Sequence, residues 1–262
     1  VAAGGSRDTI EKAVAYMATR PPQELTRGGQ IGRLLMAVTA ARHNPRDFGG
    51  ANYVRALADK YNPATGAYDQ GVYGHALAVL GMVAANESVP EQAITFIRVN
   101  ECPNFGFGHD TGCPGGADAD TTAIVLSALV AVRVAPADPI RVHTRDYLLG
   151  VAQNRTGGFG HRPGEPDNAN STGLVLSAIV ALGENPTASP WTRPDGGGPV
   201  GVLLALQQSD GGFRFDASAS APDPYATFQA VPPLAGVPYP TATRDGGDDI
   251  DHLLATLRRL SG

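Results

Sequence analysis

The chain has 262 residues and a formal net charge of −5, and 42% of its residues are apolar. This length suits one large domain or two small ones, and the composition disfavours disorder and a membrane span. The thinly spread acidic balance gives no reason to expect nucleic acid as a partner.

Helical periodicity accounts for most of the chain, and no segment convincingly predicts a strand. The expected helices cover residues 10–19, 30–42, 52–61, 72–85, 90–99, 121–132, 139–152, 171–182, 200–208, 224–231 and 249–260. Pro232-Pro233 is expected to cut the tenth helix short. Because no long linker divides these helices, we expect a single domain over residues 1–262.

One segment of the sequence occurs twice, at an offset of 50 residues (167 − 117). Residues 117–132 read ADADTTAIVLSALVAV, and residues 167–182 read DNANSTGLVLSAIVAL. A period of this length indicates stacked supersecondary units that share a core. Each copy opens with a polar box, in which Asp120 or Asn170 is the expected N-cap of the helix that follows.

The loops repeat as well. A Gln-x-x-x-Gly-Gly-Phe pattern occurs at residues 153–159 and 207–213, with a partial copy at 104–109 and a degenerate one at 65–69. Each turn follows an apolar helix and precedes an Ala-rich one. The repeating unit is therefore helix, glycine-aromatic turn, polar box, helix, and the glycines permit the positive φ of such turns.

The two cysteines, Cys102 and Cys113, lie close together in one loop rich in glycine and proline. We expect a disulfide, which would imply an oxidising compartment and contribute about 3 kcal/mol of stability. A two-cysteine metal site or two free thiols are the alternatives. The sequence of residues 1–5 resembles a mature or trimmed terminus. We infer secretion from the expected disulfide.

Glycine-aromatic turns followed by an Asp-rich or Asn-rich box and an Ala/Leu/Val helix resemble the repeats of the prenyltransferase and terpene-cyclase superfamily. The resemblance covers roughly residues 61–240. It implies an all-α fold, the (α/α)6 toroid, with about 50 residues per repeat and a pocket where the inner helices begin. The inner helices would start near Gln30, Val72, Thr121, Ser171 and Pro224. Within the superfamily, the chain resembles a secreted branch similar to the helical domain of transcobalamin and intrinsic factor more than it resembles any cyclase.

Class II terpene cyclases, in this superfamily, protonate an alkene or epoxide with the middle Asp of an Asp-x-Asp-Asp-Thr-Ala box. Asp120 matches the proton donor, but Thr121 replaces the Asp that follows it. The second copy carries Asn168 and Asn170 in place of both carboxylates, which suits a helix cap and not an acid catalyst. We therefore expect capping, and Asp120 stays the only candidate catalytic residue.

Two other activities of the superfamily lack their residues. A zinc prenyltransferase would need Cys where Thr122 stands, and a complement-type thioester would need Cys-Gly-Glu-Gln, whereas proline follows each cysteine. His109 and His161 recur in matching Gly-Phe-Gly-His turns without a third ligand at metal spacing. We therefore expect no metal and no cofactor.

These observations predict a secreted or cell-surface, non-catalytic toroid that binds a small molecule, such as a corrinoid or an isoprenoid-like ligand, or a macromolecular partner. The alternatives are a terpene-cyclase-like enzyme with Asp120 as proton donor, and a structural surface module whose loops bind protein. The residues expected near the pocket are Tyr68, Asp69, Gln70, Tyr73, Phe107, Asp118, Asp120, Phe159, Asn170, Phe213 and Tyr225. For the three phenylalanines, packing between repeats is the preferred interpretation.

Overall fold

The computed structural model describes residues 7–19 and 24–239. Within these ranges all regular elements are helical, and no strand is present. The elements are α1 (Arg7–Ala18), α2 (Gly28–Ala40), α3 (Tyr53–Ala58), α4 (Val72–Ala84), α5 (Glu91–Val99), α6 (Ala119–Ala131), α7 (Pro139–Tyr147), the π-helical turn η2 (Leu148–Ala152), α8 (Ala169–Ala181), α9 (Pro199–Leu206) and α10 (Pro224–Leu234). The helix expected at 249–260 lies outside the described residues.

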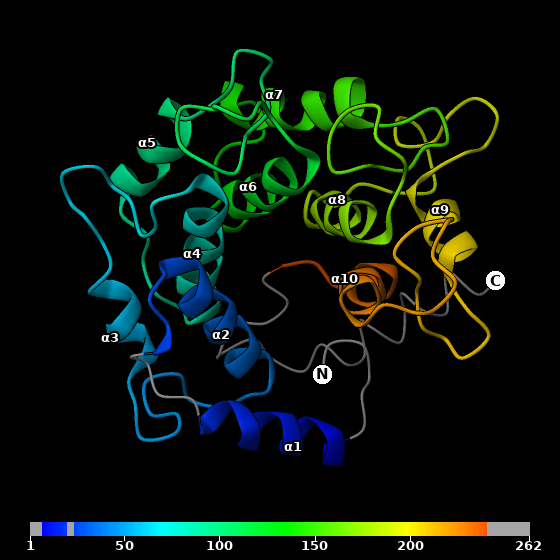
Figure 1. Ribbon diagram of the computed structural model, residues 1–262. Coiled ribbons are helices and arrows are strands. Elements are labelled where there is room, and N and C mark those ends of the chain that lie inside the picture. Colours follow the sequence, from blue (N-terminus) through cyan, green and yellow to red (C-terminus); the bar gives the residue numbers. More distant parts are fainter. Residues whose placement is uncertain (1–6, 20–23, 240–262) are drawn as a thin grey trace.

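The helices form two layers, as the repeat predicts. Helices α2, α4, α6, α8 and α10 pack each against the next and form an inner arc, while α3, α5, α7 and α9 lie outside it (Figure 1). Helix α1 lies on the open side of the arc, between α2 and α10 (Figure 1). The inner helices are the five that the Ala-rich segments predict, and the sixfold repeat count stays a prediction.

Glycines allow the backbones of α2 and α4 to touch. A Cβ atom added to Gly32 would lie 2.3 Å from the carbonyl oxygen of Leu77, and one added to Gly81 would lie 2.5 Å from the Cα atom of Gly32. No side chain fits between the two backbones at these positions, so α2 and α4 are in backbone contact there.

The N-caps of α6 and α8 lie two residues earlier than the sequence suggests. Asp118 accepts a hydrogen bond from the Thr121 N–H at 2.6 Å, and Asn168 accepts one from the Ser171 N–H at 2.8 Å. The expected caps Asp120 and Asn170 are wrong. Both residues already lie inside their helices. The N–H groups that they would cap donate to helix carbonyls, so Asp120 and Asn170 have no free N–H group to cap.

The proline pair does not end α10 as expected. Pro232 and Pro233 lie inside the helix, which continues to Leu234 and closes with a hydrogen bond from the Ala235 N–H to the Val231 carbonyl at 3.0 Å. The prolines remove two donors from the last turn but keep a helical φ, so the turn forms with fewer hydrogen bonds.

Each glycine-aromatic turn is bonded to the inner helix that follows it. The N–H groups of Phe107, Phe159 and Phe213 donate to the hydroxyls of Thr122, Thr172 and Thr227 at 2.9, 3.1 and 2.9 Å. In the α4 repeat the acceptor is Nδ1 of His75, which takes the Tyr68 N–H at 3.1 Å. These bonds hold the buried aromatic rings against the inner helices, as the packing interpretation requires.

A second set of bonds joins each turn to the preceding inner helix. The Ala119 N–H donates to the His161 carbonyl at 2.9 Å, and the Ala169 N–H donates to the Phe215 carbonyl at 2.8 Å. The corresponding bond from Tyr73 to the His109 carbonyl is longer, at 3.4 Å. We call these main-chain links the repeat joints, because they connect consecutive repeats around the arc.

The predicted disulfide is present, with 5.7 Å between the Cα atoms of Cys102 and Cys113. It closes the loop that carries His109.

In the described part of the chain, no helix combines the length and apolar character that a bilayer crossing requires.

Candidate functional site

A cavity of about 590 Å³ lies inside the arc, and its wall is mainly apolar. Helix α1, the five inner helices and Tyr239 all contribute to it. The lining residues are Thr9, Ile10, Ala13, Val14, Met17, Arg33, Met36, Ala37, Ala40, Ala41, Tyr73, Leu77, Ile124, Leu174, Tyr225, Phe228, Gln229, Pro232 and Tyr239. A space of this volume, with a few polar groups in an apolar wall, is typical of small-molecule sites.

The inner helices contribute residues to the cavity in layers. The sixth residue of each inner helix lines the wall, and these residues are Arg33, Leu77, Ile124, Leu174 and Gln229. The second residues are Gly29, Tyr73, Asp120, Asn170 and Tyr225, of which the two tyrosines line the cavity. Four residues of α-helix advance about 6 Å, so the two layers are one helical turn apart.

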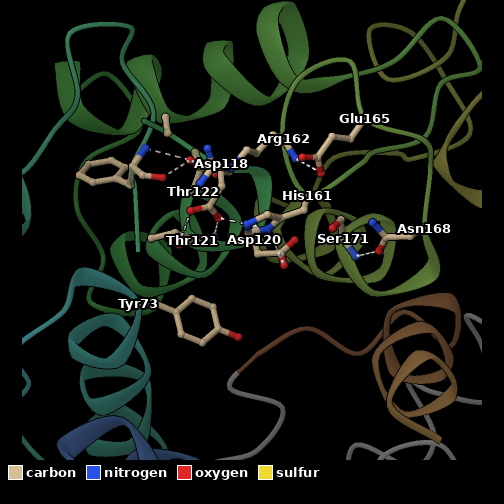
Figure 2. Close-up of polar contacts among 12 residues, drawn as sticks. Tyr73, Asp118, Asp120, Thr121, Thr122, His161, Arg162, Glu165, Asn168 and Ser171 are labelled. Carbon is tan, nitrogen blue, oxygen red and sulfur yellow. Dashed lines mark hydrogen bonds and ion pairs between the residues drawn. The ribbon is translucent and has the colours of Figure 1, made fainter. Parts of the chain in front are cut away.

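Asp120 and His161 form a pair between α6 and α8 (Figure 2). Nδ1 of His161 lies 3.2 Å from Oδ2 of Asp120, while Oδ1 of Asp120 is buried and has no hydrogen-bond partner among the described residues. The repeat joint at Ala119 holds the backbone of His161 beside the first turn of α6. The pKa of His161 is raised, chiefly by its hydrogen bond to Asp120.

Asp118 is buried and serves the helix. Its two carboxylate oxygens accept from the N–H and the hydroxyl of Thr121, at 2.6 and 2.9 Å. Burial raises the pKa of Asp118, and the two hydrogen bonds from Thr121 act in the opposite direction. Thr121, which stands where the class II box has another Asp, therefore completes the cap.

Tyr73 projects from α4 toward the middle of the arc (Figure 2). Its hydroxyl accepts a hydrogen bond from Nη2 of Arg33 at 2.8 Å, and its ring stacks on His109 with 5.7 Å between the centroids. Burial raises the pKa of Tyr73, so the phenol is neutral near pH 7.

The other residues singled out from the sequence lie elsewhere. Tyr68, Asp69 and Gln70 line a separate pocket of about 700 Å³, and Asp69 accepts the Gly29 N–H at 2.8 Å. Asn170 resembles Asp120 in that its Oδ1 atom is buried without a partner among the described residues.

Sequence reasoning identified polar residues of the second layer and missed Arg33 and Gln229 in the sixth. Counting four residues onward from the second position of each inner helix would have found both, because residues i and i+4 share a helix face.

Metal binding finds no support in the part of the chain that the structure describes. It contains no group of three or more His, Cys, Asp or Glu side chains that could hold an ion. Nδ1 of His109 is paired with Asp110 at 3.0 Å.

The sequence matches no protein-family model. Over 93 residues it is 37% identical to drimenyl diphosphate synthase of Streptomyces showdoensis, a match that covers 34% of this chain and 15% of that enzyme. Among solved structures, Candida albicans protein geranylgeranyltransferase-I complexed with GGPP resembles the chain with a TM-score of 0.45 and 16% identity, over 67% of this chain and 52% of that one. That TM-score is too low to support a conclusion about the fold. The similarity to the synthase is local.

Proposed function

We propose that the chain is an acid-bearing helical domain of the class II terpene-cyclase type, which binds an isoprenoid in the central cavity and protonates an alkene with Asp120. The carboxylate of Asp120 carries the proposal. Asp118 takes the capping role that favoured a purely structural interpretation of the box. Asp120 is paired with His161 through one oxygen, and its other oxygen has no partner among the described residues. The local similarity to drimenyl diphosphate synthase supports the same reaction class.

We assign the acidic proton to Oδ1, the oxygen of Asp120 without a hydrogen-bond partner among the described residues. Asp120 itself does not line the cavity and lies one helical turn before Ile124, which does. His161 donates to Oδ2, and a donor on the second oxygen strengthens the acid because it stabilises the carboxylate that remains. Transfer of the proton to one alkene carbon leaves a tertiary carbocation on the other. The π electrons of a neighbouring double bond then close a ring and move the positive charge to another carbon. Loss of a proton from an adjacent carbon to water ends the reaction as an isomerisation, and solvent returns a proton to Asp120.

Deuterium incorporation tests this proposal. The protein is incubated in D2O with isoprenoid diphosphates, isoprenoid alcohols and squalene, and products are analysed by mass spectrometry for a cyclised skeleton carrying one solvent deuteron. We expect Asp120→Asn to lower turnover at least about 100-fold, because general acids contribute that much or more. Asp118→Asn is the matched control, since Asn168 shows that Asn caps the corresponding helix.

Undiminished turnover by Asp120→Asn would refute the proton-donor assignment. A non-catalytic isoprenoid binder is the second candidate, because Thr121 replaces an acid of the class II box while the cavity remains. It would be recognised by isoprenoid binding without deuterium incorporation for any substrate. Secretion or a cell-surface location also stays a proposal, supported by the disulfide.

A further inference from the structure

Arg33 places a permanent positive charge in the apolar wall of the central cavity. The corresponding residues of the next three inner helices are Leu77, Ile124 and Leu174, so packing at this level does not require a charge. No carboxylate of the described residues lies within ion-pair distance of Arg33. Its contacts are with Tyr73, through the hydrogen bond at 2.8 Å and through a guanidinium carbon 5.5 Å from the ring centroid.

Two phenol hydroxyls accompany this guanidinium. Tyr73 accepts from Arg33, and the proton of its own hydroxyl has no acceptor among the described residues. Tyr239 lines the same cavity, and its N–H donates to the Ser177 hydroxyl at 3.2 Å, which fixes the segment after α10 against α8. The hydroxyl of Tyr239 likewise has no hydrogen bond in the described part of the chain.

Arg33, Tyr73 and Tyr239 all line the central cavity. Burial raises the pKa of both Tyr73 and Tyr239, the charge of Arg33 acts in the opposite direction on both, and Tyr73 adds to the rise at Tyr239. Both phenols therefore keep their protons near neutral pH. The guanidinium and the two O–H groups make a cluster of donors without an acidic partner.

We propose that Arg33, Tyr73 and Tyr239 bind the phosphorylated head group of the isoprenoid whose tail Asp120 protonates. This inference rests on the proposed function and extends it to the substrate class and its direction in the cavity. A guanidinium matches phosphate oxygens through paired N–H donors, and phenol O–H groups can complete the shell. A bound anion would also neutralise Arg33, whose charge would otherwise oppose a carbocation in the same cavity.

The positions of Arg33 and Asp120 in these two layers set the direction in which a bound isoprenoid would lie. Arg33 lies in the sixth layer on α2, and Asp120 lies in the second layer on α6, across the arc. Tyr73 lies on α4, which packs between α2 and α6, and its hydroxyl bonds to Arg33. A head group at Arg33 would therefore place the tail along the apolar residues of α4 and α6, toward the acid.

Calorimetric binding of farnesyl diphosphate, farnesyl monophosphate and farnesol tests the inference. We expect both phosphorylated ligands to bind the unaltered protein at least about tenfold more tightly than farnesol, since a charge-assisted pair is worth that much. Arg33→Gln should lower the affinity for the phosphorylated ligands by at least about tenfold and leave farnesol binding unchanged. Comparison of the two phosphates distinguishes a one-phosphate site from a diphosphate site.

Matched variants separate the possible failures. Arg55→Gln on α3 removes an arginine whose partner is Asp59 on the same helix, and it should change none of the affinities. Tyr239→Phe, which removes one hydroxyl and retains the ring, should weaken binding of the phosphates only. Equal affinity for farnesol and its phosphates, or an unchanged preference in Arg33→Gln, would overturn the head-group site and leave the proposed function intact. Failure of all three ligands to bind would overturn the head-group site, and the proposed function would fall with it only if no isoprenoid, squalene included, gave a deuterated cyclic product.

Discussion

Asp118 combines a structural role with an unfavourable charge. Its pKa is raised in the folded protein, so the native state holds its proton to higher pH than the unfolded chain does. The free energy of unfolding should therefore fall as pH rises from the ordinary range of a carboxyl, near 4, through the raised value.

The variant Asp118→Asn should lose this pH dependence while retaining the cap. We expect the variant to gain stability relative to the unaltered protein as pH rises from 4 to 7, measured by urea unfolding at each pH. Asp118→Ala removes the cap and should lower stability by about 1 kcal/mol throughout. Parallel profiles for the Asn variant and the unaltered protein would contradict the raised pKa.

His161 should report the charge of Asp120 directly. Its raised pKa means that the pair stabilises the fold below the ordinary histidine range and that this contribution is lost as pH rises through the folded-state value. Because His161 is about half exposed (47%), solvent screening keeps the contribution below about 1 kcal/mol.

Asp120→Asn should lower the pKa of His161 toward the value of an isolated histidine. NMR titration of the imidazole Cε1–H signals measures this shift. An unchanged His161 titration would show that the pair does not form in solution.

At the level of single residues, the polar box could be located from the sequence, but the residue predicted to cap the helix was the wrong one. Asp118 and Asp120 both fit a capping pattern, and the choice depends on where the backbone first becomes helical. Asp118 is extended, with φ −128°, and Asp120 already lies inside α6. The distinction matters for the proposed function, because a carboxylate that caps a helix is not available as an acid, whereas Asp120 does not cap α6. Nothing in a local pattern reveals it.

Among the helices, the contact between α2 and α4 depends most on small residues. Gly32→Ala should lower the free energy of unfolding by about 1–3 kcal/mol or more, because the new methyl group meets backbone atoms that cannot yield. The matched control is Gly201→Ala in α9, where a Cβ atom would meet nothing within 4 Å.

Gly201→Ala should stabilise the protein by about 0.5–1 kcal/mol through lower backbone entropy in the unfolded chain. Thermal unfolding of both variants measures the contrast. Equal effects of the two substitutions would mean that α2 and α4 do not make backbone contact.

Helix identity was predictable throughout the described ranges, and helix ends were less so. The expected helix at 139–152 ends its α-helical part at Tyr147 and continues as the π-helical turn η2, a change of hydrogen-bond register that apolar periodicity does not reveal. Helix α10 accommodates two prolines in its last turn because their fixed φ is helical, and the turn forms although two N–H donors are missing.

For the whole molecule, the disulfide should be a substantial source of stability. Cys102 and Cys113 are 11 positions apart, and closing a loop of that size contributes about 3 kcal/mol in the chain-entropy account. Urea unfolding of a Cys102→Ser/Cys113→Ser double variant should show a loss of this order. Reduction of the unaltered protein should give the same loss, and stability that is insensitive to reductant would contradict the prediction.

The two-layer arrangement was predictable because the repeat encodes it. The inner helices α4, α6, α8 and α10 each follow a glycine-aromatic turn, and the order of inner and outer helices follows the order of the repeats. The sixfold closure and the single domain stay predictions, since the expected helix at 249–260 lies beyond the described residues. The cavity was expected in outline, but its charged residue was not, because Arg33 precedes the first recognisable turn of the repeat.

The repeat joints make the site exchangeable from one repeat to the next. A hydrogen bond between main-chain atoms, and not a side-chain contact, fixes the distance between the end of each glycine-aromatic turn and the start of the preceding inner helix. At the joint between Ala169 and Phe215, the positions of Asp120 and His161 are occupied by Asn170 and Phe215. A scaffold of this kind can therefore acquire, lose or relocate an acid–histidine couple by two substitutions, while its architecture stays the same.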